Sequence, residues 1–320
     1  MKLILRFCIA AILIASFQPV FAQPSAQDGA TGIPGKFIVT LLGTGGGPPV
    51  RLRRFGPSTL IQAGDQKLLF DCGRGVLFRL TQAGVPLESI TRVFLTHLHS
   101  DHIVGIPDLL LTPWASSARK SNLEFWGPAG TSTMMNGLQQ AFAFDIHIRR
   151  DVDERFPAEG IRVLSHDVHE GIVYEHGGVK VKAFLVDHGP VKPALGYRIE
   201  YGGYSVVLSG DTRYSENLIQ NSKGTDLLIH EASDPDAIRA HLDSEKLERI
   251  RAHHITAEQL GKLFVTVKPR LAVLYHTSGD YNLLSKLRNE YSGPVEMGED
   301  LMTIEIAEKI NLHQTTPTWQ

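Results

Sequence analysis

The sequence predicts an α/β protein in which two mixed β-sheets lie face to face, with helices on the two outer faces. Short apolar runs bounded by glycine-containing turns predict strands in two groups, one in each half of the chain. Helical patterns follow each group, and this order favours a four-layer αββα sandwich. No Pro/Ser-rich linker or low-complexity run interrupts residues 37–308, so we expect one domain over that range.

The first half of the domain is predicted to open with three strands: Phe37–Leu42, Ser58–Ala63 and Lys67–Asp71. Val76–Ala83 has a helical pattern and is followed by Gly84 and Pro86, which are typical of a helix end. Arg92–Leu95 predicts a buried strand. Val104–Leu111 predicts a short helix packed behind the loop that leaves this strand.

The second half repeats the pattern with another group of strands: Val179–Val186, Leu195–Glu200 and Ser205–Ser209. Thr256–Val267 predicts a helix, because Thr256 followed by Ala257 and Glu258 suits a helix N-terminus. Leu271–Tyr275 predicts one more strand after this helix. Strands followed by helices in both halves therefore favour two mixed sheets with helices outside.

The two ends of the chain are expected outside this domain. Residues 1–22 combine Lys2 and Arg6 with an apolar run too short to span a bilayer comfortably, and they end in small residues typical of signal-peptide cleavage after Ala22. We therefore expect a periplasmic or secreted protein without stable membrane association, with an N-terminal membrane anchor as the alternative. Residues 23–36 are expected to form a flexible leader and residues 309–320 a C-terminal tail.

Charge and cysteine content bear on the partners. The formal net charge falls from −2 to −4 on cleavage, because the signal peptide carries two basic residues and no acidic one. A mildly acidic chain is a poor general binder of polyanions, so no nucleic-acid partner is expected, although Arg51, Arg53 and Arg54 leave room for a local basic patch. Only Cys72 would remain after cleavage, so no intrachain disulfide is expected.

The most informative stretch is Thr96-His-Leu-His-Ser-Asp-His102. It follows the buried strand predicted at 92–95, and alternation would point His97 and His99 the same way while Asp101 and His102 curl back on the turn. Imidazole and carboxylate groups are ligands that Zn²⁺ prefers, and an incomplete protein shell leaves room for water. The stretch therefore predicts a metal site with places for two ions.

The His-x-His-x-Asp-His pattern resembles the signature of the metallo-β-lactamase superfamily, whose members bind two metal ions between two β-sheets. Three later segments resemble the rest of that signature in order: Val186-Asp-His-Gly189, Leu208-Ser-Gly-Asp-Thr212 and Leu274-Tyr-His-Thr277. The resemblance implies a first metal bound by His97, His99 and His188. It implies a second metal bound by Asp101, His102 and His276. Asp211 would bridge the two ions.

The ribonuclease Z-like branch of that superfamily is the part that the chain resembles, through segments over most of residues 37–280. These segments are Leu42–Pro48, Leu69–Gly73, Gly196–Glu200, His230–Ser233 and His254–Gln259. Zinc-dependent arylsulfatases and phosphodiesterases of this branch fit the motifs equally well. No Gly/Pro/Lys-rich arm, which grips tRNA in ribonuclease Z, is visible between Gly127 and His188. The last metal motif also lacks an arginine often found before its tyrosine, and both departures count against tRNA processing.

The ligand set implies hydrolysis. Two Zn²⁺ ions roughly 3.5–4 Å apart can share a water whose pKa is lowered toward about 7, with Mn²⁺ or Fe²⁺ as an alternative occupant of one site. His254 is the expected proton donor to the leaving group, because it matches the extra histidine of the branch and lies outside the ligand set. Glu231 is expected to orient it. Asp101 completes the catalytic candidates. A competing interpretation is that His253 and His254 only cap the helix predicted from Thr256.

Two further residues are assigned supporting roles. Asp71, at a strand end, is expected to orient a ligand histidine by accepting its other N–H, with a structural turn as the alternative. Tyr197 is a candidate substrate contact, with a core position as the alternative. The glycine-rich stretch 43–47 could let backbone N–H groups approach an anion, but it lacks the strand–helix context of a nucleotide-binding motif.

The function predicted from these observations is an exported dizinc hydrolase of small anionic esters, either phosphodiesters or aryl sulfates. Its partner would be a small-molecule substrate, and a homodimer is compatible with the sequence. A periplasmic β-lactamase is the alternative, ranked lower because classical zinc β-lactamases commonly carry cysteine where this chain has Asp211. A ribonuclease Z-type RNA endonuclease ranks lower still, because of the expected export. A non-catalytic metal-binding protein is disfavoured by the complete ligand set.

Overall fold

The computed structural model describes residues 35–117, 119–232, 243–277 and 281–314. The signal peptide expected at 1–22 and nearly all of the expected leader lie outside the described residues, so cleavage after Ala22 stays a prediction. Among the helices of the described part, none is long and apolar enough to cross a membrane.

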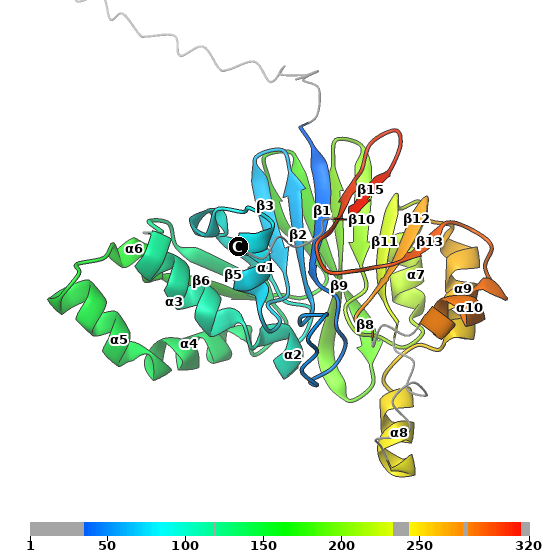
Figure 1. Ribbon diagram of the computed structural model, residues 1–320, viewed down its shortest axis with the longest axis horizontal. Helices are drawn as coiled ribbons and strands as arrows, with labels where there is room; N and C mark the ends of the chain where they lie inside the picture. Colours follow the sequence, from blue (N-terminus) through cyan, green and yellow to red (C-terminus); the bar gives the residue numbers. More distant parts are fainter. Residues whose placement is uncertain (1–34, 118, 233–242, 278–280, 315–320) are drawn as a thin grey trace, which may run out of the picture. The chain divides into compact units, whose positions relative to one another are not determined.

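The first sheet has eight strands, six from the N-terminal half of the domain and two, β14 and β15, from its C-terminal end (Figure 1). β1 runs antiparallel to β2 and to β14, whereas β3, β4, β5 and β6 are parallel to one another. In spatial order the strands are β15 (Asn311–Gln314), β14 (Met302–Glu305), β1 (Phe37–Gly43), β2 (Ser58–Ala63), β3 (Gln66–Phe70), β4 (Arg92–Phe94), β5 (Leu123–Gly127) and β6 (Val163–Asp167).

The second sheet has seven strands and is also mixed. β7 to β10 form an antiparallel meander, and β10 to β13 run parallel. In spatial order the strands are β13 (Val295–Met297), β12 (Leu271–Tyr275), β11 (Leu227–Glu231), β10 (Tyr204–Leu208), β9 (Val191–Tyr201), β8 (Val179–His188) and β7 (Gly171–His176). Two mixed sheets were predicted, and both are confirmed.

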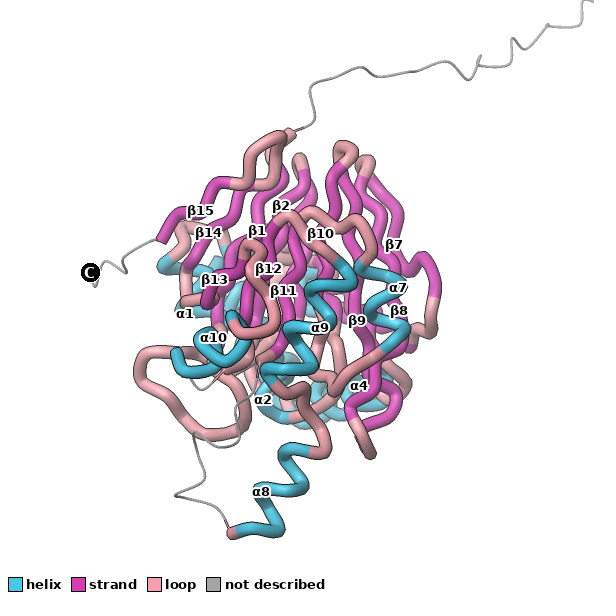
Figure 2. The backbone as a smooth tube through the Cα atoms, turned by 90° about the vertical axis from the view of Figure 1, so that its right-hand side faces the viewer, coloured by secondary structure: helices cyan, strands magenta, loops and turns pink. Residues whose placement is uncertain are grey.

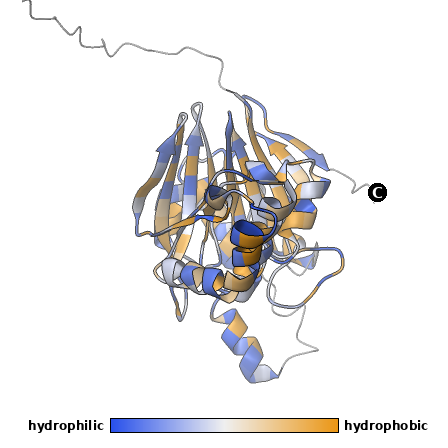
Figure 3. Cartoon of the chain, turned by 90° about the vertical axis from the view of Figure 1, so that its left-hand side faces the viewer, coloured by the Kyte–Doolittle hydropathy of each residue, from blue (hydrophilic) through white to orange (hydrophobic). Residues whose placement is uncertain are grey.

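The main core lies between the sheets and is built by alternation along the strands. In β12, Leu271, Val273 and Tyr275 belong to the core between the sheets, whereas Ala272 and Leu274 pack against the outer helices. Every residue of β12 is therefore buried. Burial on both faces is typical of parallel strands that are covered by a layer on each side. Some strands in Figure 3 alternate hydrophilic and hydrophobic residues instead, and the mixed burial pattern of β8 fits this alternation.

Helices cover the outer face of each sheet, which confirms the predicted αββα order (Figure 2). The first sheet packs mainly on α1 (Val76–Gln82) and α3 (Ile106–Ser117), and the second on α7 (Glu216–Ser222), α9 (Ala257–Val267) and α10 (Tyr281–Arg288). The remaining helical segments are α2 (Ser100–Ile103), η1 (Leu87–Ser89), α4 (Thr131–Ala141), α5 (Ala143–His147), η2 (Ile148–Val152), α6 (Ala158–Ile161) and α8 (Ser244–Arg251).

The structure differs from the predicted elements in three places. The helix expected at 104–111 is two helices, because α2 begins at Ser100, inside the metal motif, and α3 runs from Ile106 to Ser117. Residues 123–176 form strands and helices that the sequence analysis did not anticipate. Residues 311–314, expected in a tail beyond residue 308, form β15, which pairs antiparallel with β14. Main-chain pairing, rather than an apolar pattern, defines β15, since its residues are all exposed.

Candidate metal centre

The seven predicted ligand residues meet at one edge of the sheets. Two follow a strand of the first sheet, two lie on a short helix, and three come from strand ends of the second sheet. They are His97 and His99 after β4, Asp101 and His102 on α2, His188 at the end of β8, Asp211 after β10 and His276 after β12. Because β8, β10 and β12 run in the same direction, their C-terminal ends share this edge.

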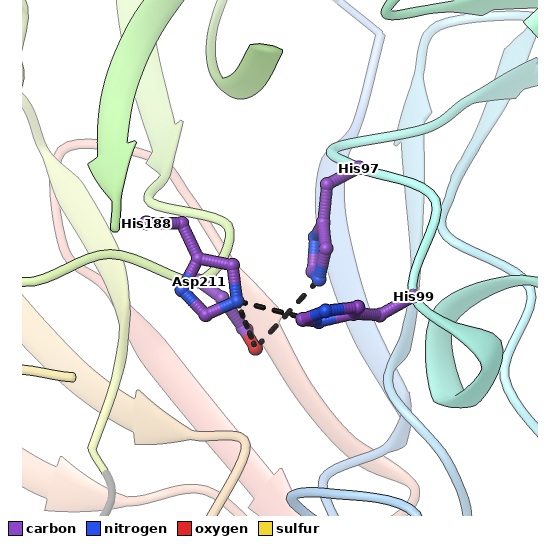
Figure 4. A group of neighbouring side chains, drawn as sticks. All are labelled: His97, His99, His188 and Asp211. Carbon is purple, nitrogen blue, oxygen red and sulfur yellow. Dashed lines mark hydrogen bonds and ion pairs between the residues drawn. The ribbon is translucent and has the colours of Figure 1, made fainter. Parts of the chain in front are cut away.

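The first group contains His97, His99, His188 and Asp211, and Figure 4 shows their polar ends turned toward one another. One ligand atom from each lies within 4.8 Å of the others. The Nε2 atom of His188 is 3.3 Å from Nδ1 of His99. Oδ2 of Asp211 is 3.9 Å from Nε2 of His97 and from Nε2 of His188. Three imidazoles and a carboxylate therefore surround one point.

The second group contains Asp101, His102 and His276. Nε2 of His276 is 3.2 Å from Oδ2 of Asp101, and Nε2 of His102 is 3.7 Å from the same oxygen. Asp211 also reaches this group: its Oδ2 is 3.3 Å from Nε2 of His276, and its Oδ1 is 3.4 Å from Nε2 of His102. Asp211 thus lies between the two groups.

The unsatisfied atoms of these groups indicate what the site could hold. Nε2 of His97, Nε2 of His102 and Oδ1 of Asp211 are buried and have no hydrogen-bond partner within the described part of the chain. Buried polar atoms without partners are costly, and here their lone pairs converge. Nitrogen and carboxylate donors in this arrangement fit a divalent cation of the zinc type.

Asp71 lies directly behind the second group. Its Oδ2 is 2.8 Å from Nδ1 of His102, and its Oδ1 accepts hydrogen bonds from the backbone N–H and the hydroxyl of Thr96. The Thr96 hydroxyl is also 3.1 Å from Nδ1 of His97. The carboxylate therefore contacts one ligand imidazole directly and reaches a second through Thr96. These contacts are of the kind that an orienting residue makes, and the orienting role expected for Asp71 stays a prediction.

The electrostatics of the centre keep its carboxylates ionised. Burial alone would raise the pKa of the Asp211 carboxyl, but His276 and His102 hold that pKa well below its ordinary value. The pKa of Asp101 is likewise lowered to about 2, because its hydrogen bond with His276 and the charge of His102 outweigh its burial. Burial and the neighbouring His102 lower the pKa of His97 well below its usual value, so that its imidazole is neutral and its lone pair is free to bind a cation.

His254 lies beside the centre and outside both ligand groups. Its Nδ1 is 3.1 Å from Oε1 of the fully buried Glu231, and its ring packs near the rings of His188 and His276. Burial lowers the pKa of His254, but the charge of Glu231 and the hydrogen bond to it raise the pKa to about 9. The helix-cap interpretation is wrong, because Thr256 is the N-cap of α9 and forms a capping box with Gln259.

Tyr197 does not reach the centre. It is fully buried, and its hydroxyl donates a 2.8 Å hydrogen bond to the carbonyl of Leu95, just before the metal motif. Its ring packs against Phe70 and Phe94 in the core between the sheets. The predicted substrate contact is therefore wrong and the core alternative is right, because the alternation of β9 points this side chain inward.

A basic pocket adjoins the second group. It is lined by Gly47 and Asp101 and by the side chains of Arg51, Arg54 and Arg74. These guanidinium groups donate to carbonyl and hydroxyl oxygens, and none of their hydrogen bonds among the described residues is to a carboxylate. Nε of Arg51 is buried without a partner in the same part of the chain. The pocket therefore places three guanidinium groups, none of them hydrogen-bonded to a carboxylate among the described residues, beside the candidate ligand Asp101.

Three contacts of the centre were missed by the sequence analysis. The carbonyl of His253 is 3.1 Å from Nδ1 of His188, the Thr96 hydroxyl joins Asp71 to His97, and the N–H of Gly47 donates to Nε2 of His276 at 3.3 Å. The first and third use backbone atoms, which no residue type specifies. Only Thr96, the first residue of the motif, offered a signal.

The sequence and the fold of this chain are similar to those of several known proteins. A family model described as anti-Pycsar protein Apyc1 matches residues 37–254. The ribonuclease Z of Mycolicibacterium gilvum is 36% identical over 279 residues, which cover 84% of this chain and 96% of that protein. The metallo-β-lactamase fold protein YhfI from Bacillus subtilis has a TM-score of 0.64 at 23% identity, covering 84% of this chain and 99% of that one. Human tRNase Z, short form, has a TM-score of 0.61 at 24% identity, covering 83% and 98%.

These relatives overturn two predictions made from the sequence. The prediction of an exported hydrolase of small anionic esters, phosphodiesters or aryl sulfates, is wrong, and so is the prediction of a small-molecule partner with no nucleic acid. Both are contradicted by relatives named ribonuclease Z that match 84% of this chain. The match covers 96% of the first relative, so this chain aligns with nearly the whole length of that protein.

Proposed function

We infer the function of this chain from its family: it belongs to the ribonuclease Z-like branch of the metallo-β-lactamase superfamily, and to the family described as anti-Pycsar protein Apyc1. It is thus a member of a family of metal-dependent hydrolases. Our proposal is that it cleaves phosphodiester bonds in RNA, as an endonuclease of the ribonuclease Z type. The observation that carries the proposal is the convergence of seven ligand side chains on a chain 36% identical to a ribonuclease Z.

The proposed ligand assignment gives each ion three histidine or aspartate side chains of its own. The first Zn²⁺ would be held by His97, His99 and His188, and the second by Asp101, His102 and His276. Asp211 would contact both, since its oxygens lie 3.3 to 3.9 Å from imidazoles of the two groups. Two ions at such a site activate water near neutral pH and neutralise charge that develops on phosphoryl oxygens.

The chain itself supplies the proton for the leaving group. His254 holds Glu231 through Nδ1, which leaves Nε2 for the substrate, and its ring centroid is 5.9 Å from that of His276. When the P–O bond breaks, the proton on Nε2 passes to the departing ribose oxygen. Glu231 fixes the ring, because the same oxygen also accepts from the backbone N–H groups of Thr212 and Ile255.

The basic pocket supports an anionic polymer as the substrate. Arg51, Arg54 and Arg74 lie next to the proposed ligand Asp101, and none of them is hydrogen-bonded to a carboxylate within the described part of the chain. Backbone phosphates of RNA are the groups that such cations bind. The overall charge of −2 was a poor guide, because a net charge does not show a local group of basic residues such as the three arginines of this pocket.

The proposal is tested by offering the zinc-loaded protein an RNA oligonucleotide, a tRNA precursor and DNA of the same sequence. Asp211→Ala serves as the variant without a complete ligand set. Asp226→Asn serves as a matched control, because Asp226 is a carboxylate that precedes β11, at the end of this strand away from the metal centre. Cleavage of RNA by the wild type and the control, without cleavage by Asp211→Ala, is the expected result. Cleavage of none of the polymers by the metal-loaded wild type would contradict the proposal.

A further inference from the structure

A buried ion pair lies outside the ligand set and has no part in the proposed chemistry. Nη2 of Arg79, on α1, is 2.9 Å from Oδ2 of Asp300, in the turn before β14, and both side chains are about 5% exposed or less. Taking two charges out of water is costly, so a pair in this position needs further hydrogen bonds to be tolerated. The Asp300 carboxylate is therefore expected to accept hydrogen bonds from groups other than Arg79.

Asp300 holds both ends of the loop that follows β1. Its Oδ1 accepts hydrogen bonds from the backbone N–H of Thr44 at 2.9 Å and from the Thr44 hydroxyl at 2.7 Å. Its Oδ2 accepts from the backbone N–H of Phe55 at 2.8 Å and from Nε and Nη2 of Arg79. One carboxylate thus closes the loop 44–55 at its base, and Arg54 reinforces the closure by donating to the Thr44 hydroxyl.

The same loop rests on the ligand His276. Gly46 donates a backbone hydrogen bond to the carbonyl of Thr277, and Thr277 donates one to the carbonyl of Thr44. The approach is so close that a Cβ atom on Gly46 would lie 2.5 Å from the carbonyl oxygen of His276. The backbone of His276 has a positive φ of 49°, which a non-glycine residue keeps only when its surroundings enforce it.

We propose that Asp300, held in place by Arg79, is a positioning residue for the second metal site. It fixes the loop 44–55, and the loop in turn holds His276 in the backbone conformation that aims its Nε2 at Asp101 and Asp211. The first metal site, built from His97, His99 and His188, has no contact with this loop among the described hydrogen bonds. Loss of the carboxylate therefore weakens the second site and spares the first.

A purely stabilising role for the pair makes a different prediction, because it would lower stability without distinguishing the two sites. The chain offers a matched control at the other end of the sheets. Asp226 is a mostly buried carboxylate that accepts hydrogen bonds from the backbone N–H of Ser205 and from Arg270. It precedes β11, whereas the metal centre lies beyond the far end of that strand. Asp226→Asn removes a similar interaction away from His276.

The deciding experiment is a zinc titration of the apo full-length protein, with a competing chelator, for wild type, Asp300→Asn and Asp226→Asn. For Asp300→Asn we expect the Kd of the second site to rise on the order of tenfold, as for partners that orient metal ligands, while the Kd of the first site changes less than twofold. For Asp226→Asn we expect both Kd values to stay within twofold of wild type. The second site is identified by titrating wild type and His276→Ala with Co²⁺ and recording the absorption of the bound ion. The step that His276→Ala loses belongs to the second site. Equal Kd values in Asp300→Asn and wild type, or equal weakening of both steps, would overturn the proposal.

A second variant keeps the test decisive should Asp300→Asn fail to fold. Thr44→Val preserves side-chain shape and removes one hydrogen bond to Asp300 and one from Arg54. Its matched control is Thr225→Val, whose buried hydroxyl bonds to Ser205 at the opposite end. A several-fold loss at the second site in Thr44→Val alone is expected, and no loss would refute the proposal. The inference rests on the proposed ligand assignment but not on RNA as the substrate. If wild type binds no zinc, the ligand assignment is wrong. If wild type and the variants all bind zinc normally at both sites, only this inference is wrong.

Discussion

Replacement of Asp71 by asparagine should weaken metal binding while leaving the backbone in place. Asp71 has a φ of 57°, a left-handed conformation that asparagine tolerates better than most residues, so Asp71→Asn adds little strain. The amide oxygen of the new side chain can still accept from the backbone N–H of Thr96, as Oδ1 does now at 2.8 Å. The amide nitrogen, however, replaces the oxygen that lies 2.8 Å from Nδ1 of His102.

The size of the effect follows from that lost contact. A hydrogen bond to a charged group contributes about 1.5–3 kcal/mol, and each 1.4 kcal/mol corresponds to roughly tenfold in affinity. Partners that orient metal ligands typically change affinity by about 10- to 100-fold. We therefore expect zinc affinity of Asp71→Asn to fall by about 10- to 100-fold. The assay is chelator competition, with thermal unfolding of the apo protein to measure the folding contribution separately. Zinc affinity within twofold of wild type would refute the reasoning.

Three further predictions follow from individual contacts. His254→Ala should bind zinc normally but cleave RNA about 10²- to 10⁴-fold more slowly, which is the usual contribution of a proton donor. Hydrolysis of bis(p-nitrophenyl) phosphate should slow far less, because nitrophenolate leaves without protonation. Equal slowing of both reactions would rule out the donor role. Tyr197→Phe removes a buried hydrogen bond to Leu95, so the free energy of unfolding should fall by about 1 kcal/mol in urea denaturation with KM unchanged, and a raised KM would restore the substrate contact rejected above. Arg51→Ala should weaken RNA binding and reduce the slope of log Kd against log salt concentration by about one, and an unchanged slope would exclude a phosphate contact.

The metal centre was predicted because residues 96–102 have metal-ligand spacing and because three later segments resemble the superfamily signature. In the structure these ligands follow strands that end at one edge. Each ligand type is specified by a short motif, and the C-terminal ends of β8, β10 and β12 share a direction. The layered fold followed from the same strands, whose apolar runs are continuous where both faces are buried. Residues 123–176 escaped prediction because their strands are short and half-exposed, as in β6 and β7.

What the sequence could not supply were contacts between distant or non-specific groups. Asp300 lies 256 positions from Thr44 and 221 from Arg79, so neither residue signals the other. The contacts of His253 and Gly47 with the centre use backbone atoms. The substrate was mispredicted for a related reason: the metal ligands specify hydrolysis but not the group hydrolysed, and the net charge hides the local basic pocket.

The most direct test of the central claim is RNA cleavage measured as zinc is added back stepwise to the apo protein, for wild type and Asp211→Ala together. The account predicts that wild-type cleavage rises as the ligand groups fill and levels off once both ions are bound, whereas Asp211→Ala stays inactive and binds zinc weakly. Full RNA cleavage by Asp211→Ala, or cleavage by wild type in the absence of any divalent ion, would contradict it.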